Sequence, residues 1–502
     1  MAKEKQAELK ADASDAPAPK PVVHAPQSQV QSACHDVFFA TLFLIAFGLT
    51  IALALMYGDD VLSTSSGQQS VTSAETLLRE KHAKYKYALK ICAGIAGGAL
   101  LASMLWTTLM LVCGKMLIWI SVVGVCTVSV GTGLASSNFL KQQGDSMYWW
   151  PAAVGSLFAV LVLLYVCCIR QRIAFASANL QVACKAVLNH PMTLLIAMVF
   201  TVLQIAWALV WIIATYAAIT HGEYVGQGED YGAGKKFGIF IGMVLIFFWA
   251  TLVLRNIVMV ATAGTVSSWW HHAAQDRVPL TTARALVRAL TLSFGSICFG
   301  SLIVSIVQTI RFVLSSIQHA LSRSGNSVAA CLVGCINCLV GCIQSWIEYF
   351  NRFAYAYVGI YGYSFVSSGK RVCQLFASKG WTAIMNDSLI VNVLFCGKVV
   401  VGFLGAAAAW AVVAYGDAQW TVNVSHPETT LGISGFLVGY SVADVIMSVI
   451  DGAVATVFIL FAEDPHSLAL SHTEAHESLH SAWKEMYPEE YENATKRHEE
   501  SV

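Results

Sequence analysis

Three carboxylates lie inside stretches of this 502-residue chain that are long and apolar enough to cross a bilayer: Glu348, Asp444 and Asp451. A bare carboxylate in hydrocarbon costs at least about 2.5 kcal/mol, so it normally faces a partner or a water-filled path. Asp444 and Asp451 also share one helix face with Ser448. The acids therefore favour a protein that conducts a solute across the membrane over one that is only anchored in it. For Asp444 and Asp451 the alternative is a structural hydrogen bond between helices.

Glu348 begins a polar helix face that continues with Asn351, Arg352 and Tyr355, at spacings of three, four and seven residues. Glu348 and Arg352 have the better orientation for an ion pair between positions i and i+4. Two hypotheses follow with equal weight. Glu348 either neutralises Arg352, or supplies the counter-charge for a substrate cation beside the ring of Tyr355.

Tryptophans form a second candidate site. Trp207 and Trp211 lie one turn apart on one apolar stretch, and Trp249 lies deep in the next, followed by Asn256. Membrane tryptophans usually occupy the interfacial belts, which Trp249 does not fit. An aromatic cage at mid-depth suits a quaternary ammonium, because the ring faces attract a cation that has no N–H to donate. Packing against lipid or neighbouring helices is the alternative.

Composition places the chain in the membrane class, since 56% of its residues are hydrophobic and 12% are charged, against about 25% charged in soluble domains. We expect an all-α polytopic bundle of about ten transmembrane helices over 37–464, between a disordered cytoplasmic tail, 1–36, and a cytoplasmic C-terminal tail, 465–502. The predicted spans are 37–57, 88–113, 117–138, 148–168, 191–220, 237–270, 289–310, 329–364, 388–414 and 432–462.

The predicted orientation has both termini in the cytoplasm, because the tails and even-numbered connections carry 17 Lys or Arg against 9 in the odd-numbered ones. The ninth connection, 415–431, has no Lys or Arg and contains the sequon at Asn423. We therefore expect this loop to be extracellular and Asn423 to be glycosylated. Four further bases fall within the predicted spans: Lys90, Arg255, Arg352 and Lys398.

Two details concern helix geometry. The sixth predicted span is too long for one straight crossing, so we expect tilt, an interfacial start or a break at Gly264. Glycines crowd the second and third spans, and glycines and serines crowd the seventh, which predicts close helix packing there. They include Gly94, Gly97, Gly98, Gly124, Gly131, Gly295, Ser296, Gly300 and Ser301.

Four cysteines and three histidines have the regular spacing that a metal site could use. Cys331, Cys335, Cys338 and Cys342 fall on one helix face, which suits close packing or palmitoylation better than tetrahedral closure around a metal. His472, His476 and His480 are better explained by one face of an exposed cytoplasmic helix. No P-loop motif and no basic block occur. We expect no metal, no cofactor, no ATP and no nucleic-acid partner.

Four blocks resemble the choline transporter-like family of solute carriers: WATLVLRNIVMVATAGTVSSWW from Trp249, LSFGSICFGSLIVSIVQ from Leu292, IEYFNRFAYAYVGIYGYSF from Ile347, and FLVGYSVADVIMSVIDGAVATVFILFAEDP from Phe436. The resemblance covers residues 235–485, with weaker similarity from residue 37. The first extracellular connection, 58–87, departs from the animal members, whose loop is long and contains Cys.

The resemblance implies a ten-helix bundle in the plasma membrane that transports choline or an ethanolamine-like small cation. We expect alternating access without ATP, with a substrate site that draws on Trp207, Trp211, Trp249, Asn256, Glu348 and Tyr355, and with Asp444 and Asp451 along the path. The alternative is a membrane scaffold or lipid-handling protein that moves no solute. An intramembrane enzyme lacks a matching constellation of residues.

Overall fold

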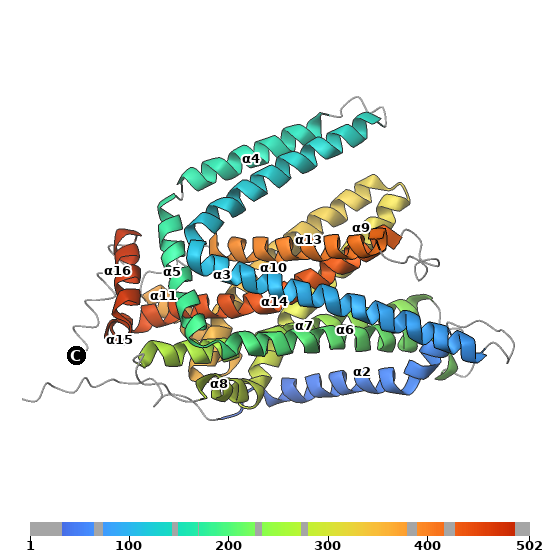
Figure 1. The fold of residues 1–502 in the computed structure, drawn as a ribbon, viewed down its shortest axis with the longest axis horizontal. Helices are drawn as coiled ribbons and strands as arrows, with labels where there is room; N and C mark the ends of the chain where they lie inside the picture. The colour runs from blue at the N-terminus through green and yellow to red at the C-terminus, as the bar shows by residue number, and fades with distance from the viewer. Residues whose placement is uncertain are drawn as a thin grey trace, which may run out of the picture.

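The computed structural model describes residues 33–64, 74–142, 149–168, 170–225, 233–272, 280–378, 389–415 and 427–486. These residues form helices and no strand (Figure 1). Seven of the helices are long and apolar enough to cross a membrane. The all-α membrane class predicted from composition is therefore confirmed, and the described part carries seven of the ten expected spans as separate long helices.

The described helices fall into an apolar group and a more polar group. The apolar helices are α2 (Val37–Thr64), α3 (Ala74–Gln142), α4 (Trp150–Cys168), α6 (Met192–Val225), α7 (Ala233–His271), α9 (Phe294–Arg323), α10 (Ser327–Tyr361), α13 (Leu389–Tyr415) and α14 (Pro427–Glu463). The more polar helices are α5 (Arg170–Asn189), α8 (Thr281–Leu290), α11 (Phe365–Ser378), α15 (Pro465–Ser471) and α16 (Thr473–Met486), and all of them have 20 residues or fewer.

Helix α14 forms the centre of the bundle. In its most apolar window 94% of the residues are buried inside the protein, against 6% to 39% for the other six spans. It packs against α3, α5, α6, α7, α10 and α13. A charged side chain on α14 therefore has protein neighbours rather than lipid, which is the setting in which Asp444 and Asp451 are found.

The short helices α5, α8, α11, α15 and α16 gather at one end of the long helices (Figure 1). All five lie in the even-numbered connections or the C-terminal segment, which the sequence analysis assigns to one side of the membrane. The turn from α9 to α10 lies toward the other end, and the chain reverses there at Gly325, whose φ of 79° is in the left-handed region.

The predicted second and third spans belong to one continuous helix of 69 residues, α3. Figure 1 shows its ribbon changing direction, so that the second half runs beside α4 and extends away from the other helices. The short connection 114–116, expected as a loop between two spans, is therefore helical.

Of the three alternatives for the long sixth span, the break at Gly264 does not occur, because α7 is helical throughout Ala233–His271. Gly264 instead allows α7 to approach α10. A Cβ added at Gly264 would lie 3.1 Å from the carbonyl oxygen of Gly359. In the other direction, a Cβ added at Gly359 would lie 2.6 Å from the carbonyl oxygen of Val260. Arg288 of α8 also donates to the Gly359 oxygen. This glycine is required by close packing.

The packing role predicted for small residues holds for α9. Gly295 and Gly300 both lie too close to other parts of the chain to accept a Cβ. In α3 it holds at Gly133, where a Cβ added at Gly155 of α4 would lie 2.4 Å from the Ser129 oxygen and 3.4 Å from the Cα of Gly133, but not at five other glycines. Gly97 and Gly98 have no such neighbour within 4 Å, and the same is true of Gly94, Gly124 and Gly131. Among the described residues another close glycine contact between two spans is on α13 and α14, where a Cβ at Gly405 would lie 2.3 Å from the Gly435 oxygen.

Part of the predicted C-terminal tail is folded. Asp464 directly follows α14 and caps α15 by accepting from the backbone N–H of Ser467 at 3.1 Å. His472 stacks on Trp269 with 4.1 Å between ring centroids, and Lys185 pairs with Glu474 at 3.0 Å. The segment 465–486 is thus docked on α5 and α7.

Candidate functional site

The charged side chains of four helices meet inside the bundle. Arg255 of α7 lies between the two acids of α14, with Nε 3.1 Å from Asp444 Oδ2 and Nη2 3.9 Å from Asp451 Oδ2. Lys398 of α13 pairs with Asp444 at 2.7 Å. Arg352 of α10 donates to Asp451 Oδ1 at 3.0 Å. These five residues, called here the ion cluster, contain three cations and two carboxylates.

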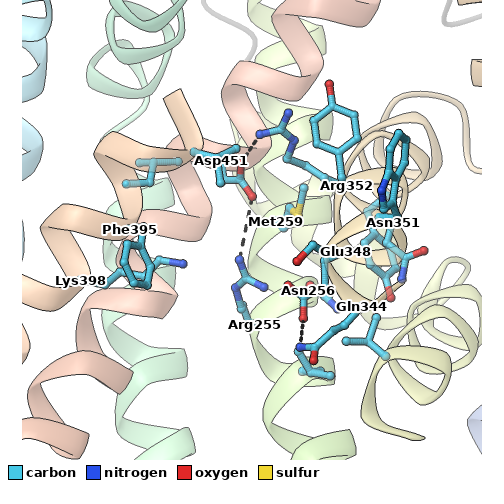
Figure 2. Close-up of a pocket in the computed structure, with 18 of the residues that line it drawn as sticks. Arg255, Asn256, Met259, Gln344, Glu348, Asn351, Arg352, Phe395, Lys398 and Asp451 are labelled. Atoms are coloured by element: carbon cyan, nitrogen blue, oxygen red, sulfur yellow. Dashed lines mark hydrogen bonds and ion pairs between the residues drawn. The ribbon is translucent and has the colours of Figure 1, made fainter. Parts of the chain in front are cut away.

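The positions of the two acids explain this geometry. Asp444 and Asp451 are separated by seven residues, two turns of helix, and therefore face the same neighbours. Because α14 is buried, each carboxylate needs a counter-charge from a packed helix. Arg352 reaches Asp451 from α10 while Arg255 reaches it from α7, as Figure 2 shows.

The ion pair predicted between Glu348 and Arg352 is not formed. Arg352 is only 6% exposed and pairs with Asp451, which is also held inside the protein. Glu348 is exposed in the isolated chain and accepts hydrogen bonds from two amides, Gln344 Nε2 at 2.6 Å and Gln308 Nε2 at 3.4 Å. A buried acid gains more from the arginine than an exposed one does, because its charge has lost more hydration.

A cavity of about 680 Å³ opens beside the ion cluster, between α7, α9, α10, α13 and α14. Four of the predicted site residues line it: Asn256, Glu348, Tyr355 and Asp451. The remaining lining residues are Leu252, Arg255, Met259, Val304, Arg311, Gln344, Ser345, Trp346, Tyr349, Asn351, Arg352, Val391, Leu394, Phe395, Lys398 and Tyr440. Asp444 is connected to this wall through Lys398 and Arg255.

The inner wall contains a short chain of hydrogen bonds. Asn256 Nδ2 donates to Ser301 Oγ at 2.9 Å, and Ser301 Oγ lies 3.2 Å from the hydroxyl of Tyr355. Tyr355 is almost completely buried and stacks at a tilt against Phe365. The polar groups on this wall are therefore already bonded to one another, which fixes the ring of Tyr355 in place.

Aromatic rings are placed on several sides of the cavity. Trp346, Tyr349 and Phe395 line it together with Tyr440 and Tyr355. The guanidinium of Arg352 lies over the ring of Tyr349 at 5.1 Å from the centroid. Among the described residues Glu348 is in no ion pair, and aromatic faces next to such a carboxylate are a combination that can hold an ammonium ion.

The three predicted tryptophans lie elsewhere. Trp249 donates to the Cys298 carbonyl at 2.9 Å and packs edge-on against Phe43. Trp207 stacks on Phe47 at 4.5 Å, and Trp211 donates to the Met243 carbonyl at 2.7 Å. These contacts belong to the packing of α2, α6, α7 and α9. The structure does not bring Trp207, Trp211 and Trp249 to the cavity that Glu348 lines.

Several cavity residues were not singled out from the sequence. Arg255 and Lys398 were noted only as bases within predicted spans, although a base at that depth needs an acid as much as an acid needs a base. Arg311 was assigned to a connection, and its side chain bonds Gln344 Oε1 at 2.8 Å. Bases inside apolar stretches were the signal that could have identified Arg255 and Lys398.

The other sequence motifs fall outside this site. Cys331, Cys335, Cys338 and Cys342 are exposed on α10, and the residues that the structure describes contain no grouping of potential ligands that could hold a metal ion. His476 and His480 lie on α16, whereas His472 precedes that helix. Asn423 lies outside the described residues.

The fold and the site define a polytopic helical membrane protein with a charged, partly aromatic cavity between its spans. A family model described as plasma-membrane choline transporter matches residues 153–466. The chain belongs to this choline transporter-like family.

Relatives in fungi extend the similarity beyond that region. The chain is 28% identical over 404 residues to the protein PNS1 of Yarrowia lipolytica, covering 78% of this chain and 69% of the relative. It is 27% identical over 466 residues to PNS1 of Mycosarcoma maydis, covering 90% and 83%. With PNS1 of Cryptococcus neoformans the identity is 27% over 378 residues, which spans 65% of that relative's length.

Proposed function

We propose that this protein transports choline or a similar small organic cation across the plasma membrane, by alternating access and without ATP. The observation that carries the proposal is the position of Glu348. It lines the cavity, and among the ion pairs of the described residues none involves it. Its carboxylate is therefore available as the counter-charge of an ammonium ion, with Trp346 and Tyr349 as neighbouring aromatic faces.

The family supports a transporter, and the ion cluster supports a solute path in the same region. A scaffold would gain nothing beyond packing from five charged groups beside a cavity. A cation of fixed charge can be accumulated by the membrane potential alone. At about 100 mV, inside negative, the drive is roughly 2.3 kcal/mol per charge, which supports roughly fifty-fold accumulation.

The proposed orientation places both termini and the end that carries α5, α8, α11, α15 and α16 in the cytoplasm, from the distribution of Lys and Arg. Asn423, in the opposite loop, is the proposed glycosylation site. Epitope tags at the two termini, tested with antibody on intact cells, check this arrangement. Staining of either tag without permeabilisation contradicts it.

The central test is uptake of radiolabelled choline into liposomes that contain only this protein, with an inside-negative potassium diffusion potential. We expect potential-dependent uptake by the wild type and at least a tenfold lower rate for Glu348→Gln, which keeps the size of the side chain and removes its charge. Glu474→Gln removes an acid from the exposed pair with Lys185 and is the matched control.

Absence of choline uptake by a well-folded wild type contradicts the transporter proposal and favours a scaffold. Uptake that is equal in Glu348→Gln and in the wild type contradicts the role of Glu348 alone. Monodispersity in size-exclusion chromatography shows in each case that the variant has folded.

A further inference from the structure

The cavity is surrounded by more cations than carboxylates. In the described part of the chain the cations at its wall are Arg255, Arg311, Arg352 and Lys398. The carboxylates at the wall or paired with it are Glu348, Asp444 and Asp451. A site that binds only a cation is expected to have more carboxylates than cations at its wall, because a negative local field attracts a positive ion.

One arginine of the ion cluster also retains an unused donor. Arg352 is 6% exposed, lines the cavity, and donates Nη1 to Asp451, but its Nε has no hydrogen-bond partner. Arg255 also lines the cavity, and its Nε is ion-paired with Asp444 Oδ2 at 3.1 Å, so it contributes charge to the wall. A buried N–H without an acceptor is destabilising, and a charged donor binds an anionic acceptor more strongly than a neutral one.

The carboxylate of Glu348 lies at a different position on the cavity wall from these guanidinium groups. Glu348 is one turn of α10, about 5.4 Å of rise, from Arg352. It is connected to Arg311 only through an amide, because Gln344 accepts from Arg311 at 2.8 Å and donates to Glu348 at 2.6 Å. The wall thus presents a carboxylate and two guanidinium groups at neighbouring positions, as Figure 2 shows for Glu348, Arg255 and Arg352.

We propose that the cavity contains a subsite for an anionic group, held by Arg352 and Arg255, next to the ammonium site at Glu348. The ligand then presents both charges. It is either a zwitterion, in which a carboxylate or phosphate is attached to the ammonium compound, or an ammonium cation accompanied by a free halide. The inference rests on the proposed function in one respect, since it takes the same cavity as the path of the solute.

The test measures the midpoint of thermal unfolding of the purified full chain in detergent, starting in sodium gluconate. A ligand that binds the folded protein raises this midpoint. Sodium chloride replaces gluconate in one arm without any organic ligand. Choline, glycine betaine and phosphocholine are added in gluconate in the others, with sucrose as a control for osmolyte effects.

Three variants connect the response to the subsite. Arg352→Gln leaves the ion cluster with equal numbers of positive and negative groups and removes the unused donor. We expect it to weaken the anion response at least about tenfold in midpoint concentration, the effect of one charged hydrogen bond. Arg352→Lys keeps the charge and retains part of the response. Arg371→Gln, on the exposed face of α11, leaves it unchanged.

The added ligands distinguish a free halide from the anionic group of a zwitterion. A chloride response lost in Arg352→Gln supports a free halide, and tighter binding of glycine betaine or phosphocholine than of choline supports a zwitterion. Wild-type protein that responds to neither chloride nor the zwitterions overturns the subsite, even if the variants do not fold. A missing choline response with a positive chloride arm contradicts the cation proposal and leaves the anion subsite intact.

Discussion

Arg352 on α10 and Asp451 on α14 form an ion pair with 3.0 Å between Nη1 and Oδ1, across 99 positions of the sequence. This pair joins the Cys-rich helix to the central helix of the bundle. It also leaves Glu348, the expected partner of Arg352, with only neutral hydrogen-bond partners among the described residues. One long-range pairing thereby separates the structural acid from the acid that remains available to a ligand.

The first prediction concerns this pair. Asp451→Asn strands the buried guanidinium of Arg352 and should lower the free energy of unfolding by about 3 kcal/mol or more. Adding Arg352→Gln should restore part of that loss, because it removes the guanidinium that Asp451→Asn leaves buried without its carboxylate. Thermal unfolding in detergent measures both. A double variant that is no more stable than Asp451→Asn contradicts the pairing.

The second prediction separates the cavity from the tryptophans. Trp249→Phe loses the hydrogen bond to the Cys298 carbonyl and should reduce stability by about 1 kcal/mol. Choline affinity should stay unchanged, because Trp249 does not line the cavity of Glu348. A scintillation proximity assay measures the affinity. A clear weakening in Trp249→Phe would instead favour the cation site at Trp207, Trp211 and Trp249.

The third prediction uses two glycines in different surroundings. Gly405→Ala places a methyl group against the Gly435 carbonyl and should destabilise the protein by about 1–3 kcal/mol. Gly98→Ala has no such neighbour within 4 Å, and should be neutral or stabilising by up to about 1 kcal/mol, because alanine is the better helix former. Equal effects of the two changes on the unfolding midpoint would contradict the packing of α13 on α14.

The fourth prediction is a pH dependence of the docked C-terminal segment. Burial lowers the pKa of His472 below its usual 6.5, with a smaller contribution from Lys185. Burial and then His472 lower the pKa of His190 in the same way. The unfolded chain therefore takes up protons that the folded chain does not as the pH falls through 6.5.

Stability should be full above pH 6.5 and decrease below it. Unfolding midpoints measured between about pH 7.5 and about pH 5.5 check this window. His472→Gln should flatten the profile, and His319→Gln, an exposed histidine on α9, should not. An unchanged slope in His472→Gln would show that other groups cause the pH dependence.

The helical class and the polar positions within the spans could be predicted, because both follow from the cost of polar groups in hydrocarbon. Glu348 and Asp451 were found in that way, Tyr355 from the helix face that it shares with Glu348, and Asn256 from its position after Trp249. All four line one cavity. The choice of partners could not be predicted. Local spacing favoured Glu348 for Arg352, and only the packing of α10 on α14 offers Asp451 as a more deeply buried partner.

The depth of a residue along a span also did not predict which neighbouring helices its side chain faces. Trp249 and Asn256 lie on the same helix, α7, but Trp249 packs toward α2 and α9 while Asn256 points to the cavity. The direction of each face depends on the order of the helices around α14. That order arises from long-range contacts that the spacing of residues along one helix does not specify.

The position of Arg255 between two acids has a mechanical consequence. Its guanidinium already lies 3.1 Å from Asp444 and 3.9 Å from Asp451. A movement of α14 along α7 would therefore bring Arg255 closer to one carboxylate while it leaves the other. Lateral separation of the same helices would break both contacts at once. For the contacts of Arg255, displacement along the helix axes thus costs less ion-pair energy than displacement across them.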